Sequence, residues 1–99
     1  MSYLPLAVLS ANVPGTEIVN SFTNTGTDRV AVTAGVQYVA TATEDCYWDT
    51  GDGTEVASSA DHYLPAKVPR RITIPTGDTS LAAIRVAVNG DLHLEPVTN

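Results

Sequence analysis

The apolar residues of this 99-residue chain occur in short runs in which hydrophobic and polar positions alternate. Gly, Pro, Asn and Asp divide these runs about every ten residues, as in all-β sandwiches and barrels. No window shows a helical period with caps. We therefore predict one all-β domain over residues 1–99, a small β-sandwich or jelly-roll-like barrel of about eight strands. Strands are expected at 3–9, 17–23, 29–33, 36–43, 46–50, 60–64, 70–74, 81–88 and 91–97.

The stretch "IRVAVNGDLHL" predicts a hairpin between the last two of these strands. A two-residue turn, the default for an Asn-Gly pair, would mix apolar and polar residues on each face. A three-residue loop that ends at a left-handed Gly90 instead pairs Val86 with Leu92 and Ile84 with Leu94. We expect this second register, which makes the C-terminal hairpin part of the core.

Charge and cysteine content restrict the environment and the partners of the chain. Five basic residues against eleven acidic ones give a net charge of -6, which disfavours nucleic acid and anionic membranes as partners. Cys46 is the single cysteine, so the chain has no internal disulfide and fits a cytoplasmic origin. We find neither a signal peptide nor an 18-residue apolar run that would cross a membrane. Other proteins are the expected partners.

The stretch "CYWDTGDGTEV" could form a calcium loop or a tight turn after a strand. Asp49, Asp52 and Glu55 are spaced by three, whereas an EF-hand loop needs alternating oxygen ligands and flanking helices. We expect the turn, with Gly51 and Gly53 at positive φ and the carboxylates in solvent. No metal or other cofactor is predicted.

Groups that could perform catalysis are few in this sequence. His62 and His93 fall in different expected strands, and the serines lie in loops without the strand-turn-helix elbow that activates a serine nucleophile. Cys46 alternates with Trp48 toward the expected core, which favours a buried thiol over a nucleophile. We therefore predict a protein that is not an enzyme.

One local motif suggests a binding module. The segment "YWDTGDGT" resembles the Trp-Asp-x-Gly-Asp-Gly signature of the polycystic kidney disease domain, an immunoglobulin-like sandwich of surface adhesins and secreted enzymes. The following "HYLPAKVPRRITI" keeps the His-Tyr pair of that family but lacks its turn glycine. A carbohydrate- or protein-binding module of this kind is the alternative function.

A longer resemblance covers positions 36–97. The segments "YVATATEDCYWDTGDG", "HYLPAKVPRRITIP" and "LAAIRVAVNGDLHLEPV" resemble, in this order, a type of small virion protein of tailed bacteriophages. In that pattern a glycine is expected where this chain has Lys67. The resemblance implies a virion structural protein, made in the host cytoplasm, that decorates or cements the capsid or joins head and tail. Its partners would be the major capsid protein, portal or tail components, and further copies of itself.

The cluster "KVPRR" holds Lys67, Arg70 and Arg71, three of the five basic residues. Arg70 shares the strand face of Ile72, so its guanidinium is expected to reach solvent past the sheet edge or to pair with a carboxylate there, while Arg71 points outward. The prolines in and beside this cluster cannot donate to a sheet, which predicts an edge strand. The three basic residues are one candidate partner interface.

The N-terminal "SYLPLAVL" is the other candidate interface. It is either the first strand of the core or, over residues 1–10, an arm that pairs with a neighbouring chain. As an arm, it would bury Tyr3, Leu4 and Leu6 as anchors.

Overall fold

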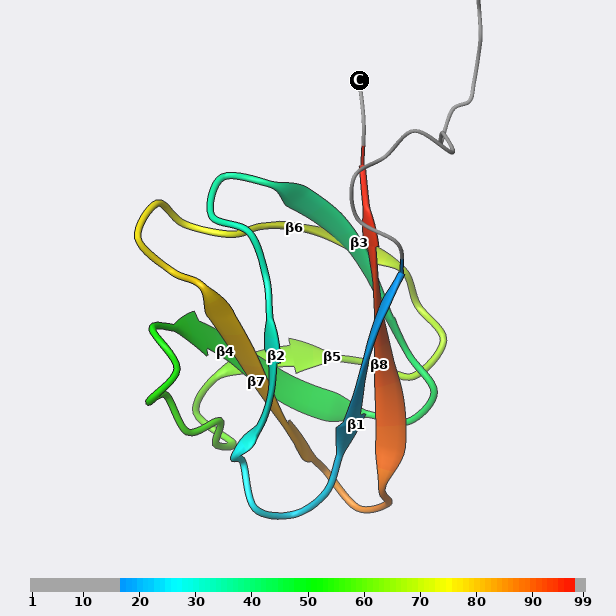
Figure 1. The fold of residues 1–99 in the computed structure, drawn as a ribbon. Helices are drawn as coiled ribbons and strands as arrows, with labels where there is room; N and C mark the ends of the chain where they lie inside the picture. Colours follow the sequence, from blue (N-terminus) through cyan, green and yellow to red (C-terminus); the bar gives the residue numbers. More distant parts are fainter. Residues whose placement is uncertain (1–16, 98–99) are drawn as a thin grey trace, which may run out of the picture.

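The computed structural model describes residues 17–97, which form two four-stranded antiparallel sheets packed face to face (Figure 1). The expected all-β sandwich is confirmed, and the sheets do not close into a barrel. Eight expected strands are present, and the strand expected at 3–9 lies outside the described residues. The strands are β1 (Ile18–Phe22), β2 (Asp28–Ala31), β3 (Gln37–Ala42), β4 (Cys46–Gly51), β5 (His62–Leu64), β6 (Arg70–Thr73), β7 (Ser80–Arg85) and β8 (Gly90–Pro96).

The strand order is that of a jelly roll. Sheet A has the order β1-β8-β3-β6, and sheet B has the order β2-β7-β4-β5. β1 therefore pairs with β8, β2 with β7, β3 with β6 and β4 with β5, as if one long hairpin had been wrapped into two layers. Most neighbours in a sheet are consequently far apart in the sequence.

The core lies between the sheets and follows the alternation of the strands. In sheet A, Ala40 and Ala42 of β3 stand opposite Leu94 and Leu92 of β8, and all four side chains are buried. Small residues on one strand beside large ones on the next let the facing sheets interdigitate at the density of a protein interior. The core cluster is Phe22, Val32, Tyr38, Ala40, Ala42, Cys46, Leu64, Ile72, Ile74, Leu81, Ala83, Leu92 and Leu94.

The predicted hairpin between the last two strands is wrong, because β7 and β8 belong to different sheets. β7 ends at Arg85, whose N–H donates to the Thr23 carbonyl, and residues 86–89 cross to sheet A. Ile84 consequently lies on the outer face of sheet B, where its neighbour on β4 is Tyr47. Local turn rules cannot detect this crossing, because β8 pairs with two strands that are distant in the sequence.

The two glycines of the acidic segment serve different purposes. Gly53 has a φ of 108°, as predicted, but Gly51 is not among the residues with positive φ and instead ends β4. A Cβ on Gly51 would lie 2.7 Å from Oε1 of Glu55. Gly51 is therefore required by the close approach of the Glu55 side chain rather than by its backbone conformation.

Cys46 lies at the centre of the core, as its alternation with Trp48 predicted, and it is fully buried. Burial and, secondarily, the negative charge of Asp45 raise the pKa of the Cys46 thiol from 9.0 to about 12. The folded protein thus holds this proton at pH values where the unfolded chain has lost it.

This difference predicts a loss of stability at alkaline pH. The contribution of the neutral thiol is complete below pH 9 and decreases as the pH rises toward 12, by up to about 1.4 kcal/mol for each pH unit. Urea denaturation between pH 8 and 11 measures it. The variant Cys46→Ala should have a shallower pH slope than the original chain, and an equal slope in both proteins would contradict this explanation.

Candidate interaction surfaces

The structure places the predicted interface residues in two groups. Tyr3, Leu4 and Leu6 lie outside the described residues, so the expected arm stays a prediction. Arg70 and Arg71 begin β6, and Lys67 lies in the connection that leads to it. β6 is an end strand of sheet A, which confirms the edge position that the flanking prolines predicted.

The two arginines of β6 point to opposite sides of sheet A. Arg71 lies on the outer face, as predicted, and its Nη1 donates to Oε1 of Gln37 at 3.1 Å. Arg70 stands opposite Ala40 on the inner side, yet it is exposed because it lies at the sheet edge. Within residues 17–97 Arg70 makes no ion pair, so its guanidinium reaches solvent past the edge instead of meeting a carboxylate.

Lys67 adopts a left-handed backbone conformation, with a φ of 63°. Its N–H donates to the Ala42 carbonyl at 2.7 Å, and Ala42 and Ala66 form an isolated bridge. These contacts fix the turn against the end of β3. A Cβ makes left-handed backbone costly, which gives a physical reason for the glycine that the phage resemblance implies here.

Asp45 joins three parts of the chain, although sequence reasoning did not single it out. Its Oδ1 accepts a hydrogen bond from the Ala66 N–H at 2.7 Å, and its carbonyl accepts one from the Val86 N–H at 3.2 Å. The turn between β3 and β4 is thereby attached to the turn before β6 and to the end of β7. The sequence feature that could have indicated this role is the position of an acidic residue directly before the buried Cys46.

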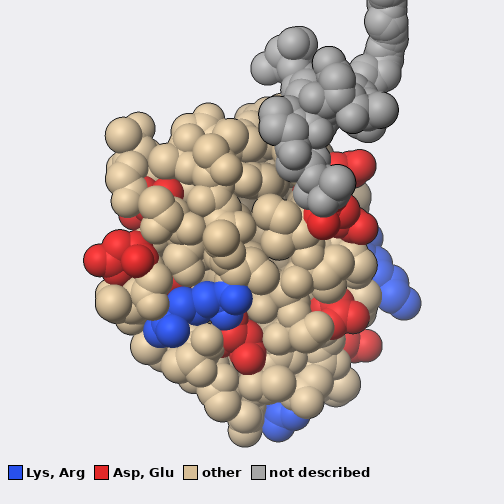
Figure 2. All heavy atoms as spheres, viewed as in Figure 1, with Lys and Arg blue, Asp and Glu red and all other residues tan. Residues whose placement is uncertain are grey.

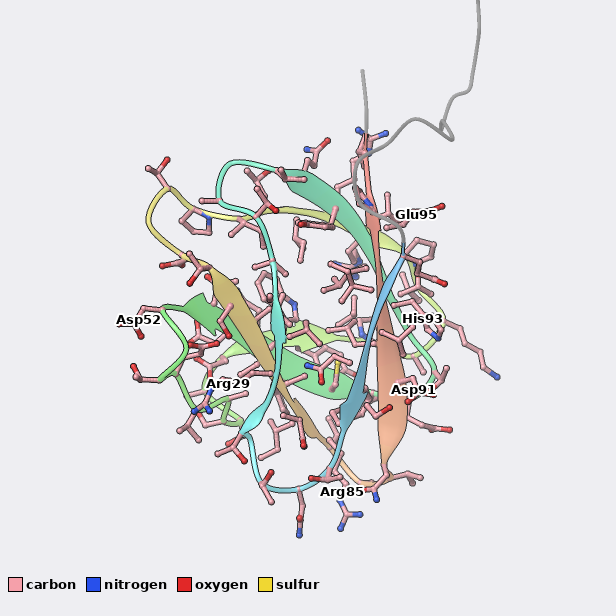
Figure 3. The ribbon with its side chains drawn as sticks, in the orientation of Figure 1. Arg29, Asp52, Arg85, Asp91, His93 and Glu95 are labelled. Atoms are coloured by element: carbon pink, nitrogen blue, oxygen red, sulfur yellow. The ribbon has the colours of Figure 1, made fainter. Side chains whose placement is uncertain are left out.

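The outer face of sheet B is partly covered by the loop of residues 52–61 (Figure 3). Nε of Arg29, on β2, donates to the Glu55 carbonyl at 2.8 Å, and the Ala57 N–H donates to the Gly26 carbonyl at 2.9 Å. Ala82 faces outward between Arg29 and Asp49, yet it is fully buried. This part of sheet B is therefore not free to bind a partner.

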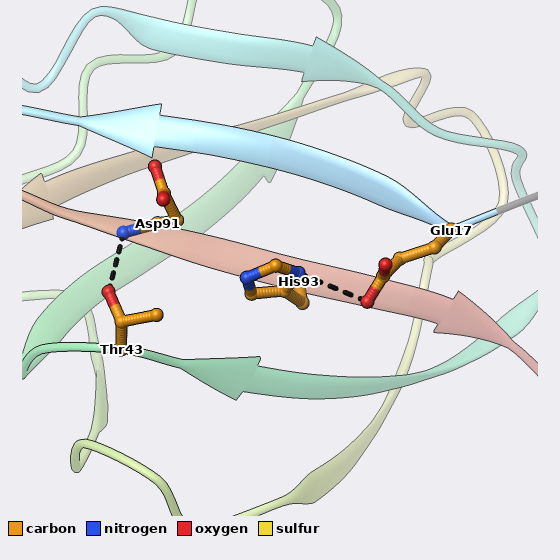
Figure 4. A network of polar contacts seen from close by, with 4 residues as sticks. All are labelled: Glu17, Thr43, Asp91 and His93. Carbon is orange, nitrogen blue, oxygen red and sulfur yellow. Dashed lines mark hydrogen bonds and ion pairs between the residues drawn. The ribbon is translucent and has the colours of Figure 1, made fainter.

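The outer face of sheet A carries a polar network (Figure 4). Nδ1 of His93 lies 3.0 Å from Oε2 of Glu17, and the Asp91 N–H donates to Oγ1 of Thr43 at 2.9 Å. Oγ of Ser21 donates to Oδ1 of Asp91 at 2.7 Å. These exposed contacts contribute little stability individually, but they give this face of residues 17–97 a polar and partly charged surface.

Aromatic side chains form two pairs across β4 and β5. Tyr47 and Tyr63 are tilted, with ring centroids 5.6 Å apart, and Trp48 stacks on His62 at 4.4 Å. Tyr63 is half exposed on the outer face, and desolvation followed by the charge of Asp45 raises the pKa of its phenol. The uncovered end of sheet B thus presents a small aromatic surface.

On the face of the molecule that Figure 2 shows, the basic side chains are isolated from one another, while acidic ones are spread more widely. Residues 17–97 contain no group of three His, Cys, Asp or Glu side chains placed to hold a metal ion. The described part of the chain likewise has no helix long and apolar enough to span a membrane.

Comparisons of the chain with protein-family models, with curated proteins and with solved structures found no match.

Replacing Lys67 with Gly should stabilise the protein by about 1 kcal/mol, because glycine adopts left-handed backbone without the clash of a Cβ. Chemical denaturation measures the change. The variant Lys67→Ala is the matched control, since it removes the charge and keeps the Cβ, and it should not gain stability. Equal effects of Gly and Ala would show that charge, and not backbone conformation, decides the outcome.

Replacing Asp45 with Ala should destabilise the protein by about 2 kcal/mol, because the partly buried Ala66 N–H loses a charged acceptor. Urea unfolding gives the value. Glu95→Ala is the control, because Glu95 is an exposed carboxylate with no hydrogen bond to residues 17–97, and its change should stay within about 0.5 kcal/mol. A small effect at Asp45 would mean that the two turns are held together by other contacts.

Proposed function

We propose that this chain is a non-enzymatic structural protein of a bacteriophage virion. It decorates or cements the capsid, or joins head and tail components, through contacts with other virion proteins and with further copies of itself. The protein is made in the host cytoplasm and becomes part of the virion.

The observation that carries this proposal is the jelly-roll strand order, together with the phage resemblance over positions 36–97. Jelly rolls are a recurrent architecture of viral capsid domains, and also of lectins. This support is an analogy at the level of the fold, because one fold can host several functions. In immunoglobulin constant domains the first, second, fifth and fourth strands share a sheet, so the strand order gives no support to the polycystic kidney disease resemblance.

The contacts between the resembling segments add a physical argument. The first segment provides Asp45 and Ala42, and the second provides Ala66 and Lys67. The Ala66 N–H donates to Oδ1 of Asp45 and the Lys67 N–H donates to the Ala42 carbonyl, each at 2.7 Å. The segments thus form one structural unit, which explains why such short motifs would occur together in a family without a catalytic signature.

A virion protein of this size acts through repeated contact area. Each copy buries a modest surface, and the symmetry of the particle adds many weak contacts into a stable shell. Within residues 17–97, the outer face of sheet A and the end strands of both sheets offer such contact area without requiring any reacting group.

Analysis of purified particles tests the proposal directly. Phage particles from cells that carry the gene should contain the protein after banding in a density gradient, at a stoichiometry that matches capsid or tail symmetry. Mass spectrometry provides the identification and the copy number. Recovery of the protein solely in the soluble fraction, with particles complete without it, would contradict a structural role.

Deletion of residues 2–9 tests the predicted arm. The strands β1 to β8 of residues 17–97 can enclose a core between two sheets, so the truncated chain is expected to fold and to lose its incorporation into particles. Circular dichroism and particle binding provide the two measurements. Failure to fold would assign the segment to the core, and normal incorporation would eliminate the arm as an attachment site.

A further inference from the structure

The two end strands of sheet A have opposite directions. β1 is antiparallel to β8, β8 to β3, and β3 to β6, so β6 runs opposite to β1. A second copy placed beside the first can therefore bring its β1 against β6 in antiparallel orientation. The sheet would continue from one copy to the next with an unchanged pairing pattern.

At the β6 edge, alternate residues direct their backbone groups away from β3. The Ile74 N–H donates to the Val36 carbonyl at 3.0 Å, and the Ile74 carbonyl accepts from the Gly35 N–H at 2.8 Å. Ile74 and, by alternation, Ile72 thus face β3 with their backbone groups. The backbone N–H and C=O groups of Arg71 and Thr73 consequently point away from β3, out of the sheet edge, and both residues are exposed.

The β1 edge has a matching set of outward groups. The Asp91 carbonyl accepts from the Thr43 N–H, and the Val97 N–H donates to the Gln37 carbonyl, so odd-numbered residues of β8 face β3. Even-numbered residues of β8 therefore face β1. Because Leu92 pairs with Asn20, the backbone groups of Val19 and Ser21 on β1 point away from β8.

We propose that copies of this chain associate head to tail by pairing β6 of one copy with β1 of the next. Arg71 lies opposite Val19 and Thr73 opposite Glu17, so two residue pairs exchange backbone hydrogen bonds. The same register places Ile72 beside the half-buried Ile18 of the next copy, which continues the apolar inner face across the contact.

The charges of the two edges complement each other in this register. Arg71 and Glu17 both lie on the outer face and become diagonal neighbours across the new strand pair, at a separation that long side chains bridge. The β6 end of sheet A carries the basic Arg70 and Arg71. The β1 and β8 side carries the acidic Glu17, Asp91 and Glu95. The contact is heterologous, because it joins two different surfaces of neighbouring copies. Such contacts produce a ring if the rotation that relates one copy to the next closes on itself.

Edge arginines and prolines also serve in other proteins to prevent strand pairing. In this chain the prolines at 69 and 75 limit β6 to a short segment, but they leave the outward groups of Arg71 and Thr73 unobstructed. A chain that used β6 only as a protected edge would remain monomeric. The proposal and this alternative therefore predict different masses in solution.

Sedimentation equilibrium of the full chain, up to about 1 mM, measures the association. We expect oligomers, and Arg71→Glu or Glu17→Arg alone should raise the dissociation constant by roughly tenfold. The double variant Arg71→Glu with Glu17→Arg should restore association. Arg85→Glu is the control, since it changes net charge from -6 to -8 as Arg71→Glu does but lies at the end of β7.

The variant Thr73→Pro removes one outward N–H and should also weaken association by roughly tenfold, while circular dichroism stays unchanged. It is independent of charge, so it tests the backbone pairing itself. A monomer at every concentration overturns the proposal. So does association that neither Thr73→Pro nor the charge reversals weaken.

These results are separate from the proposed virion role. A chain that is present in particles but monomeric in solution would retain the virion function and lose this interface. A chain that associates by this edge but is absent from particles would keep the interface and lose the function.

Discussion

The position of β8 between β1 and β3 determines most of the remaining structure. Leu92 and Leu94 lie at the centre of sheet A and are fully inaccessible to solvent, with alanines of β3 on one side and residues of β1 on the other. Burial of such side chains is the dominant favourable term in folding. Once β8 occupies this place, β7 cannot form a hairpin with it and must join the opposite sheet.

The crossing of the chain between sheets also explains where the surfaces lie. β1 and β6 become the ends of sheet A, and β2 and β5 become the ends of sheet B. The loop of residues 52–61 lies against one part of sheet B, whereas none of the loops of residues 17–97 makes a comparable backbone contact across the outer face of sheet A. Asp45 then holds the turns at one end of the sandwich together. The proposed interface uses the two edges of sheet A that have no partner strand within residues 17–97.

Much of the fold could be predicted from local patterns. The alternation of apolar and polar residues correctly predicted that each of the eight described segments is a β-strand. The positive φ of Gly53 was also predicted correctly, because glycine is the residue that adopts this conformation most easily in a turn. The partners of the strands could not be predicted in the same way, because pairing of β8 with β1 depends on contacts over more than 60 intervening residues. The wrong hairpin arose from applying a local turn rule where such distant contacts decide.

The candidate surfaces were less accessible to sequence reasoning than the fold. The prolines near Arg70 and Arg71 correctly indicated an edge, since a missing N–H is a local property. Asp45 was missed, because the significance of its carboxylate depends on the Ala66 N–H that folding brings to it. The close approach of the Glu55 side chain to Gly51 could not be predicted either, because such a contact produces no periodic pattern in the sequence.

The most direct test of this account is a nuclear Overhauser measurement on the labelled protein. Ala40 and Leu94 form a pair between β3 and β8 that does not exchange hydrogen bonds, and such pairs bring their Cα atoms to about 4.5 Å. A strong contact between the Hα protons of Ala40 and Leu94 is therefore predicted. A strong contact between the Hα protons of Ile84 and Leu94 in its place would show that β7 and β8 form a hairpin, and it would contradict the jelly-roll order.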